Sequence, residues 1–471
     1  MSKKYFIKTF GCQMNISDSE RIAGFLEDRN YKLASKIAEA DLVIFNTCGV
    51  RQMAEDRVYG QIHNLKKKSV AEKKPLQIVL TGCLANRKDV QRRLKNKVDL
   101  FFPINKFGLF ENFVIENSLK IENLKLKISE QSNNHLTKEN IDYLSINPQY
   151  TNAFQAFVPI MTGCNNFCSY CVVPYARGRE TSRPATEIIT EIKDLIKDGY
   201  KSITLLGQNV NSYCDSRGET PTKGFHPYRT VSFPQLLKKI NAIPGKFWIQ
   251  FVSSHPKDMS DELIEVIAKS RKVCELVHLP IQSGSDEILQ KMNRKYTIKH
   301  YLNLVRKIKI SFKAYKPNTP FALTSDIIVG FPGETKKQFM QSAEIMHKAK
   351  YDLVFFGQFS PRPGTVAWKM KDDVSKTEKE HREQFLNEIL KKTTFAHNKK
   401  YKNTVQEVLI DHVKSDKSDH VARKEKNNIY FGKTRTGKNV KIISSKKNLV
   451  GQFAKVKITK ANIWNLEGEL V

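Results

Sequence analysis

Short apolar runs alternate with amphipathic, helix-like stretches between residues 156 and 359, and this repeat constrains the fold more than any other feature. Strands that alternate with helices form parallel sheets, because each helical crossover returns the chain to the same edge of the sheet. Six repeats are too few for a closed eight-stranded barrel, so the sequence predicts an α/β fold with an incomplete (β/α)6 barrel at residues 150–390. The predicted strands are Ala156–Met161, Ser202–Leu206, Phe247–Val252, Leu276–Pro280, Ala322–Val329 and Leu353–Phe359. The predicted helices are Ala185–Asp198, Phe233–Ala242, Ser260–Ser270, Ser285–Lys291 with Ile298–Ile310, and Thr335–Ala349.

The loop after the first of these strands contains Cys164, Cys168 and Cys171. Eight cysteines in a chain that opens without a signal peptide indicate metal or catalytic ligands rather than disulfides. Three thiolates at this spacing suit a [4Fe–4S] cluster in which one iron has no protein ligand and can bind a small molecule. The alternative is a structural zinc site completed by a distant residue. Cys214 and Cys274 fall outside any pattern, and we expect both to be buried and unreactive.

The loops after the other five strands are rich in amides, hydroxyls and glycines, which suits a cofactor with amino-acid, ribose and adenine parts. Pro-Gly and Ser-Gly segments also occur in ordinary turns, so a single loop is weak evidence. We expect His255 and His278 to be structural. The basic turn from Arg177 to Arg183 either contacts phosphate or forms structural salt bridges. The candidate cofactor contacts are Gln208, Asn209, Gln282, Ser283, Gly284, Ser285 and, within the cysteine loop, Tyr170.

Residues 3–118 repeat the alternation of strands and helices and predict an open parallel sheet. Ser17 and Glu20 have the spacing of a capping box, so we expect the first helix to begin at Ser17. The predicted elements are the strands Tyr5–Phe10, Asp41–Phe45 and Gln77–Leu80 and the helices Ser17–Asn30 and Arg51–Lys67.

Each of these three strands is followed by a short polar turn that contains one cysteine, namely Cys12, Cys48 or Cys83. The carboxyl ends of parallel strands share one edge of the sheet, so cysteines that are distant in sequence can converge there. Glycines beside them allow a bulky cluster to approach the backbone. The sequence therefore predicts a second site with three thiolates.

Residues 119–149 are rich in Asn, Ser and Lys and predict a linker, with one possible strand at Leu124–Ile128. Residues 393–471 predict a small antiparallel β-barrel with 17 basic and 7 acidic residues, a net charge of +10. Small basic barrels with exposed aromatic side chains, here Tyr430 and Phe431, commonly bind RNA. The alternative is a barrel that only braces the enzyme. Its predicted strands are Val405–Ile410, Asn428–Lys433, Asn439–Ile443, Phe453–Ile458 and Glu469–Val471.

The whole chain of 471 residues has a net charge of +31, which favours a polyanionic partner such as nucleic acid. A general lysine bias of the genome is the alternative explanation. No apolar run reaches about 18 residues, and the chain begins Met1-Ser-Lys-Lys without a secretory signal. We therefore expect a cytoplasmic protein that does not bind membranes.

Seven motifs make the chain resemble the radical S-adenosylmethionine (SAM) methylthiotransferases, and the resemblance covers all three predicted domains. They are Gly11–Asn15, Asn46–Arg51, Thr81–Cys83, Gly163–Arg179, Leu206–Asn211, Leu279–Ser285 and Ser325–Glu334. The resemblance implies an amino-terminal methylthiotransferase domain, a radical SAM core and a carboxy-terminal TRAM domain that binds RNA.

The resemblance also implies two [4Fe–4S] clusters. Cys12, Cys48 and Cys83 would hold an auxiliary cluster, while the Cys164 loop would hold the cluster that cleaves SAM. SAM would serve both as the source of a radical and as the methyl donor. An unactivated aromatic C–H requires radical chemistry that a cofactor supplies.

The resemblance further implies that the substrate is N6-isopentenyl-adenosine at position 37 of tRNA, next to the anticodon, which would gain a methylthio group at C2. The alternatives are methylthiolation of threonylcarbamoyl-adenosine in tRNA or of an aspartate in a ribosomal protein. A flavodoxin or ferredoxin is the expected electron donor, and we expect a monomer.

Overall fold

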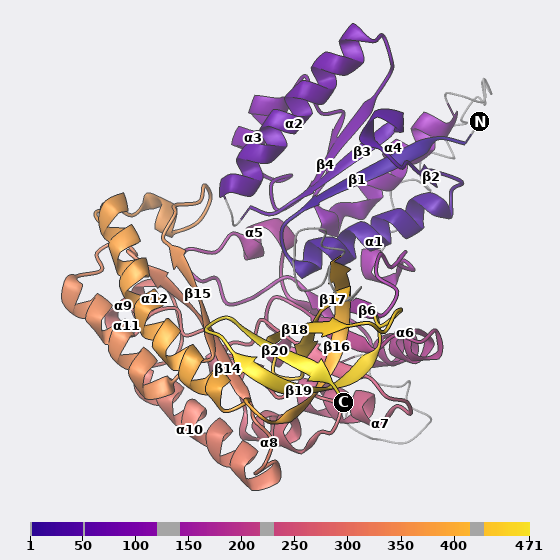
Figure 1. Ribbon diagram of the computed structural model, residues 1–471. Coiled ribbons are helices and arrows are strands. Elements are labelled where there is room, and N and C mark those ends of the chain that lie inside the picture. The colour runs from indigo at the N-terminus through magenta and orange to yellow at the C-terminus, as the bar shows by residue number, and fades with distance from the viewer. Residues whose placement is uncertain (1, 50–51, 120–141, 217–229, 415–427) are drawn as a thin grey trace, which may run out of the picture. The chain divides into compact units, whose positions relative to one another are not determined.

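The computed structural model describes residues 2–49, 52–119, 142–216, 230–414 and 428–471 (Figure 1). The predicted strand Leu124–Ile128, and most of the predicted linker, lie outside the described residues. The chain forms two compact units, each made from several segments. The first unit is Met1–Thr151, Thr162–Thr181 and Arg362–Trp368. The second unit is Asn152–Met161, Ser182–Pro361 and Lys369–Val471.

The first unit contains a five-stranded parallel sheet with the order β2-β1-β3-β4-β5. The three predicted strands are confirmed, and two-residue strands at both edges extend the sheet. The strands are β1 (Lys4–Phe10), β2 (Lys32–Leu33), β3 (Leu42–Thr47), β4 (Gln77–Gly82) and β5 (Leu100–Phe101). The helices are α1 (Gln13–Glu27), α2 (Gln52–Ala71), α3 (Lys88–Leu94), α4 (Phe107–Leu119) and, beside the cysteine loop, α5 (Val173–Arg177).

Helices cover both faces of this sheet (Figure 1). One hydrophobic core contains Phe25 of α1 and Phe107 of α4, and the other contains Ile62 of α2 and Val90 of α3. Tyr143, from the chain that leads to the second unit, is buried in the core on the α1 side. The strands β1, β3 and β4 therefore lie in the middle of the unit, and their carboxyl ends share one edge of the sheet.

The predicted start of the first helix at Ser17 is wrong, because α1 begins at Gln13 with Cys12 at its N-cap. Ser17 and Glu20 lie inside the helix and are buried. The Glu20 carboxylate accepts hydrogen bonds from the backbone amide and hydroxyl of Thr151 instead of capping the helix. A Ser-x-x-Glu spacing is also compatible with the interior of a helix, so the motif alone does not fix the first turn.

The second unit contains six parallel core strands arranged as two three-stranded sheets, β6-β9-β12 and β13-β14-β15. A parallel bridge between Ile249 and Val273 links the chain at β12 to the segment before β13. All six predicted strands are confirmed, as is the incomplete β/α barrel. The strands are β6 (Gln155–Pro159), β9 (Ser202–Leu206), β12 (Trp248–Phe251), β13 (Leu276–His278), β14 (Ala322–Val329) and β15 (Leu353–Gln358). Two-residue strands are β7 (Met161–Thr162), β8 (Thr181–Ser182), β10 (Cys214–Asp215) and β11 (Val231–Ser232).

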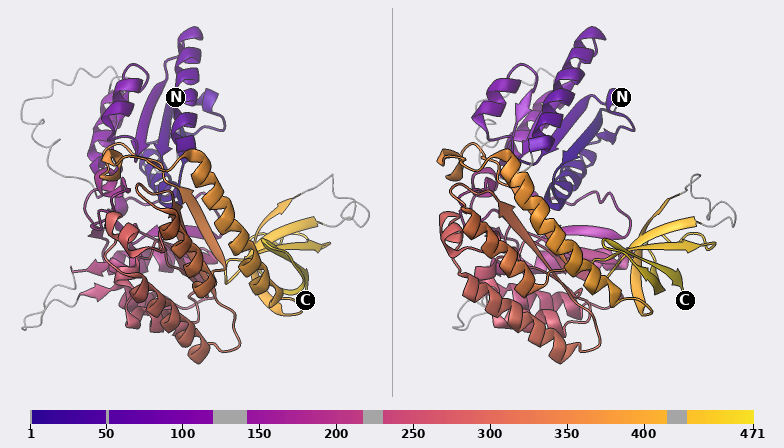
Figure 2. Two further views of the ribbon diagram at one scale, coloured as in Figure 1. Left: turned by 90° about the vertical axis from the view of Figure 1, so that its left-hand side faces the viewer. Right: turned by 60° about the vertical axis from the view of Figure 1, so that its left-hand side comes forward.

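The predicted helices of this core are also confirmed, because each buries one apolar stripe against the strands. A further helix, α12, packs against β15 and was not predicted (Figure 2). The helices are α6 (Ala185–Lys197), α7 (Phe233–Ala242), α8 (Asp261–Lys269), α9 (Asp286–Lys291), α10 (Ile298–Tyr315), α11 (Lys336–Ala349) and α12 (Lys376–Lys399).

The carboxy-terminal strands close into a five-stranded barrel with the order β16-β17-β18-β20-β19. The predicted barrel is confirmed with three corrections. The pair β18–β20 is parallel, the last strand begins at Asn465 rather than Glu469, and Tyr430 is buried in the barrel core rather than exposed. Alternation along a strand identifies two faces but does not say which one is inside. The strands are β16 (Val405–Lys414), β17 (Asn428–Thr434), β18 (Asn439–Ser444), β19 (Phe453–Ala461) and β20 (Asn465–Leu470).

Across the described ranges, no helix is both long enough and apolar enough to cross a lipid bilayer.

Candidate active site

The Cys164 loop has a fixed backbone shape. Its first glycine, Gly163, has φ +76°, and a Cβ at this position would lie 2.0 Å from the carbonyl oxygen of Arg179. The amide of Cys164 donates to the carbonyl of Gly178 over 3.2 Å, and the amide of Cys171 donates to the carbonyl of Cys168 over 3.0 Å. Glycine is therefore required at 163, and the three cysteines are presented by a loop that closes on itself.

The thiols of this loop lie in a partly dry environment. Cys164 is buried, and Cys168 and Cys171 are half-buried. Burial raises the pKa of the Cys171 thiol to about 12, and negative charge at Cys168 adds to the effect. Burial also raises the pKa of Cys164. Such thiols become thiolates only beside a strong positive charge, which is what iron would provide.

No three His, Cys, Asp or Glu side chains among the described residues surround a point where one metal ion could bind. A [4Fe–4S] cluster takes each cysteine on a different iron, so its thiolates surround a cube rather than a point. Zinc, in contrast, needs four ligands around one ion.

The second set of cysteines converges at the carboxyl edge of the first unit's sheet. Phe10 pairs with Thr47, and Thr47 pairs with Gly82, so the turns after β1, β3 and β4 lie side by side. A Cβ on Gly11 would lie 2.7 Å from Cβ of Cys48, and a Cβ on Gly49 would lie 3.1 Å from Cβ of Cys83.

These close approaches bring the turns of Cys12, Cys48 and Cys83 together, as the strand order requires. Cys48 and Cys83 are buried, and Cys12 is exposed at the N-cap of α1. The Cys12 thiol donates to Oδ1 of Asn15 over 3.2 Å.

The two sets of cysteines belong to the same compact unit and influence each other electrostatically. After burial and Cys168, negative charge at Cys164 and Cys83 contributes further to the raised pKa of Cys171. The α5 helix that follows the Cys164 loop is held by a buried ion pair, in which Nη2 of Arg177 lies 2.5 Å from Oδ2 of Asp18. The amide of Ala367 also donates to the carbonyl of Ser169 over 2.7 Å. The unit thus brings both predicted cluster sites within electrostatic range of each other.

In the second unit, the loops after β9 and β12 contain buried oxygen atoms that have no hydrogen-bond partner among the described residues. They are Oε1 of Gln208, Oδ1 of Asn209, Oδ1 of Asn211 and Oγ of Ser254. Buried polar atoms normally have partners, so a group of four orphaned atoms indicates a missing ligand. Three of the atoms are amide oxygens, which accept hydrogen bonds from ammonium, amino or hydroxyl groups. SAM carries all three kinds of donor, so these loops fit SAM.

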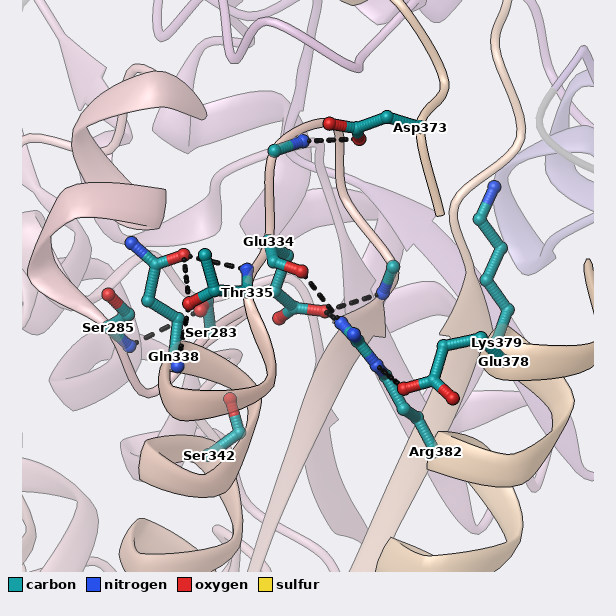
Figure 3. Close-up of polar contacts among 12 residues, drawn as sticks. Ser283, Ser285, Glu334, Thr335, Gln338, Ser342, Asp373, Glu378, Lys379 and Arg382 are labelled. Atoms are coloured by element: carbon teal, nitrogen blue, oxygen red, sulfur yellow. Dashed lines mark hydrogen bonds and ion pairs between the residues drawn. The ribbon is translucent and has the colours of Figure 1, made fainter. Parts of the chain in front are cut away.

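The segment from Gln282 to Ser285 is positioned by its neighbours, and Figure 3 draws its two serines, Ser283 and Ser285. Gln282 has φ +71° and its amide donates to the carbonyl of Asp326 over 2.9 Å. Ser283 and Ser285 are buried, and Oγ of Ser283 accepts from the amide of Ser285 over 3.3 Å. The amide of Gly284 donates to Oγ of Ser342 on α11 over 2.8 Å. Ser283, Gly284 and Ser285 therefore shape the loop, and Gln282 keeps a residual 9% exposure at its surface.

Sequence reasoning missed the Glu334–Arg382 pair beside this segment (Figure 3). Oε2 of Glu334 accepts from the amide of Gly330 over 2.7 Å and from Nη1 of Arg382 over 2.8 Å. Burial raises the pKa of Glu334, and its Oε1 has no partner among the described residues. The signal in the sequence was the Gly330–Glu334 motif, but its partner Arg382 lies 48 residues further along the chain.

The structural interpretation of both histidines is confirmed. Nδ1 of His255 accepts from the amide of Lys257 over 3.2 Å, and Nδ1 of His278 lies 2.9 Å from Oγ1 of Thr324. Burial, aided by Arg294, lowers the pKa of His255 to about 2, so its ring is neutral.

The basic turn has a structural role at two of its arginines. Arg177 pairs with Asp18, and Arg183 pairs with Glu187 and Glu191.

Tyr170 lies half-buried in the cysteine loop. The expected burial of Cys274 is confirmed, whereas Cys214 is exposed on the short strand β10, contrary to expectation.

Comparison with known proteins finds three families along the chain. Residues 4–103 match uncharacterized protein family UPF0004, residues 158–346 match the radical SAM superfamily, and residues 399–471 match the TRAM domain. A Clostridium botulinum protein named tRNA-2-methylthio-N(6)-dimethylallyladenosine synthase is 43% identical over 99% of this chain and 96% of its own length. A Thermoanaerobacter pseudethanolicus protein of the same name is 40% identical over 99% of this chain and 92% of its own length. Among solved structures, the apo form of the cobalamin-dependent SAM radical enzyme OxsB matches 82% of this chain and 56% of its own, at 10% identity and a TM-score of 0.50.

Proposed function

Because this chain belongs to the radical SAM tRNA methylthiotransferase family, we propose that it converts N6-isopentenyl-adenosine at position 37 of tRNA into its 2-methylthio derivative. The chain is a radical SAM enzyme with a [4Fe–4S] cluster and SAM as cofactors, and tRNA is its substrate. The observation that carries the finer proposal is the likeness to synthases of that modified nucleoside along nearly the whole chain.

The barrel loops support SAM as the ligand of the second unit. Gln208, Asn209, Asn211 and Ser254 would take up its donor groups, since their oxygens are buried without partners among the described residues. Gln282, Ser283, Gly284 and Ser285 would form the wall on the other sheet, where Oγ of Ser342 on α11 accepts a hydrogen bond from the amide of Gly284. When bound, a reduced cluster with SAM supplies the radical that an unreactive C–H bond requires.

Six cysteines would hold two clusters. Cys164, Cys168 and Cys171 would bind the cluster that acts on SAM, and Tyr170 would lie against the cofactor. Cys12, Cys48 and Cys83 would bind an auxiliary cluster, supported by their convergence at one sheet edge. A second SAM would donate a methyl group to sulfur at that site, so SAM would have two roles. A flavodoxin or ferredoxin would reduce the clusters, and the enzyme would act as a monomer.

The test is mass spectrometry of nucleosides from isopentenylated tRNA after incubation with reconstituted protein, reductant and SAM under anaerobic conditions. We expect the 2-methylthio product and about eight irons per chain, four for each cluster. A product formed only on threonylcarbamoyl-adenosine or on a ribosomal protein would contradict the proposed substrate while leaving the enzyme class intact.

Matched cysteine variants assign the clusters. Cys164→Ala should abolish both 5′-deoxyadenosine and product, whereas Cys83→Ala should retain SAM cleavage and lose product together with about four irons. Cys214→Ala is the control, because this cysteine is exposed and lies outside both sets. Full product formation by either cluster variant would show that the assignment is wrong.

A further inference from the structure

A cavity of about 360 Å³ opens in the second unit at the amino-terminal ends of β14 and β15. Leu323 near the start of β14 and Asp352 just before β15 line it. The candidate cofactor loops lie at the carboxyl ends of the same strands. Because β14 has eight residues and a strand rises about 3.3 Å per residue, the cavity is roughly 25 Å from those loops. It is therefore separate from the candidate active site.

The walls of this cavity, which we call the lysine pocket, are strongly basic. Five of its 14 lining residues are lysines, although Lys and Arg together make up only 79 of the 471 residues of the chain. These lysines come from three separate parts of the chain. The basic lining is therefore not simply the exposed face of one helix. They are Lys309 and Lys313 of α10, Lys316 directly after α10, Lys350 after α11 and Lys400 after α12.

Each nearby carboxylate pairs with two basic side chains, and one of these is Lys316 of the pocket itself. Asp352 lies 2.8 Å from Nζ of Lys438 and 3.1 Å from Nδ1 of His397. Glu275 pairs with Lys316 and with Arg435, at 2.6 Å in each case. For the exposed side chains of Lys313, Lys350 and Lys400, the described residues supply no acidic partner within 4.0 Å. The pocket therefore has a net positive charge.

Two of the lysines are held together against their mutual repulsion. Nζ of Lys309 donates to the carbonyl of Ala349 over 3.0 Å, next to Lys350. Lys350 itself has a left-handed backbone with φ +55°, a conformation that costs free energy for a side chain with a Cβ. The stacked rings of Phe312 and Phe321, 4.6 Å apart, give the pocket an apolar floor. An apolar floor lowers the local dielectric and strengthens attraction for an anion.

We propose that the lysine pocket binds a backbone phosphate of the tRNA substrate, at a part of the tRNA distant from the modified nucleotide. This inference rests on the proposed function for the identity of the RNA. The proposed phosphate binding is supported because the pocket adjoins the basic carboxy-terminal barrel. Residues 393–471 carry a net charge of +10. The barrel is joined directly to the pocket wall, since Lys438 pairs with Asp352 and the hydroxyl of Tyr401 lies 2.8 Å from that of Thr436. RNA lying on the barrel can thus extend into the pocket.

Two triple variants test the proposal by fluorescence anisotropy with full-length tRNA at several salt concentrations. The pocket variant carries Lys313→Gln, Lys350→Gln and Lys400→Gln. The control variant removes the same charge from α6 and α7 with Lys193→Gln, Lys197→Gln and Lys239→Gln, all of which are exposed. We expect the pocket variant to bind about tenfold more weakly and its log Kd–log[salt] slope to fall by about one. Equal losses in both variants would overturn the proposal.

A second measurement needs no substitution. Lysines of the wild-type holoenzyme are acetylated with and without tRNA, and the modified sites are identified by mass spectrometry. We expect tRNA to reduce acetylation at Lys313, Lys350 and Lys400 and to leave acetylation at Lys239 unchanged. Protection by millimolar inorganic phosphate without protection by tRNA would overturn the RNA assignment and identify a site for a free anion. Binding and protection do not depend on turnover. If tRNA binds in this way but no methylthio product forms, the proposed function fails and the pocket assignment stands.

Discussion

His255 shows how a buried titratable side chain can be fixed in one protonation state. Its ring lies against Tyr296, with centroids 5.6 Å apart, and its Nδ1 is occupied by the amide of Lys257. Burial is the main cause of its low pKa of about 2, and the cations of Arg294 and Lys257 contribute further. The side chain therefore acts as a neutral hydrogen-bond acceptor that shapes the loop after β12, and it is unsuited to proton transfer near neutral pH.

This protonation state predicts the pH dependence of stability. The unfolded chain binds a proton at His255 below pH 6.5, whereas the folded protein does so only near pH 2, so the free energy of unfolding falls as the pH drops through this range. The loss is about 2 kcal/mol at pH 5, at about 1.4 kcal/mol per pH unit. Urea denaturation of the apo-protein between about pH 5 and pH 7 should show this loss, and His255→Gln should reduce it. His347→Gln on α11 is the exposed control, and an equal effect of both variants would contradict the prediction.

Between elements, the contact of the Gln282–Ser285 segment with α11 leaves no room for a side chain. A Cβ on Gly284 would lie 2.4 Å from both the amide nitrogen and Cα of Ser342, which are backbone atoms of the helix. Backbone atoms cannot move aside as a flexible side chain can. The segment that we propose to contact SAM is therefore positioned by the helix behind it.

Gly284→Ala should displace either the segment or α11. We expect a destabilisation of about 1–3 kcal/mol, typical of overpacking, together with weaker SAM binding. Gly357→Ala is the matched control, because no atom lies within 4 Å of its added Cβ, and it should leave the free energy of unfolding nearly unchanged. Thermal unfolding and equilibrium dialysis with SAM would measure both effects. Wild-type stability and SAM affinity in Gly284→Ala would show that the loop tolerates movement.

Periodicity predicted the elements that bury a regular apolar face and missed those that do not. The six core strands are mostly apolar runs separated by helical stretches, so their existence and order were evident from the sequence. The helix α12 was missed because several of its buried positions are charged or polar, including Lys379, Arg382 and Asn398. Arg382 is buried to bind Glu334, a tertiary contact between residues 48 positions apart. Such a pairing leaves no periodic signal.

The candidate site was predictable to the extent that its residues form local motifs. The two cysteine sets follow from spacing and from the parallel order of the strands. The side-chain oxygens of Asn211 and Ser254 are buried without partners among the described residues because of the way two loops pack together. This packing could not be predicted from the sequence. The same limit explains Tyr430, whose strand was predicted correctly but whose side chain lies inside the barrel.

For the molecule as a whole, the attachment of the carboxy-terminal barrel to the core rests on buried charge. Nε of Arg435 lies 2.6 Å from Oε2 of Glu275, and its guanidinium also donates to the carbonyls of Arg271 and Val273. Trp248 of β12 packs against Phe453, with ring centroids 5.0 Å apart, and its indole nitrogen donates to Glu407 over 3.2 Å. The barrel and core should therefore unfold together.

Arg435→Ala should uncouple them. Removal of Arg435 leaves the buried Glu275 with Lys316 as a remaining cationic partner, so the lost hydrogen bonds to a charged group cost about 1.5–3 kcal/mol. Calorimetry should then show an earlier transition for the barrel, whereas Lys433→Ala, an exposed neighbour on β17, should unfold like the wild type. A single unshifted transition in Arg435→Ala would mean that the apolar contacts alone join the two parts.

The first compact unit is assembled from three separate segments of the chain, and this limits how chimeras between members of this family can be designed. Its boundaries cut across the order of the sequence, because Thr162–Thr181 and Arg362–Trp368 belong with Met1–Thr151. A chimera that joins the amino-terminal domain of one member to the remainder of a relative would separate Asp18 from its own Arg177. Functional hybrids should therefore exchange all three segments as a set. Crossovers placed after residues 151, 161, 181, 361 and 368 would preserve both compact units.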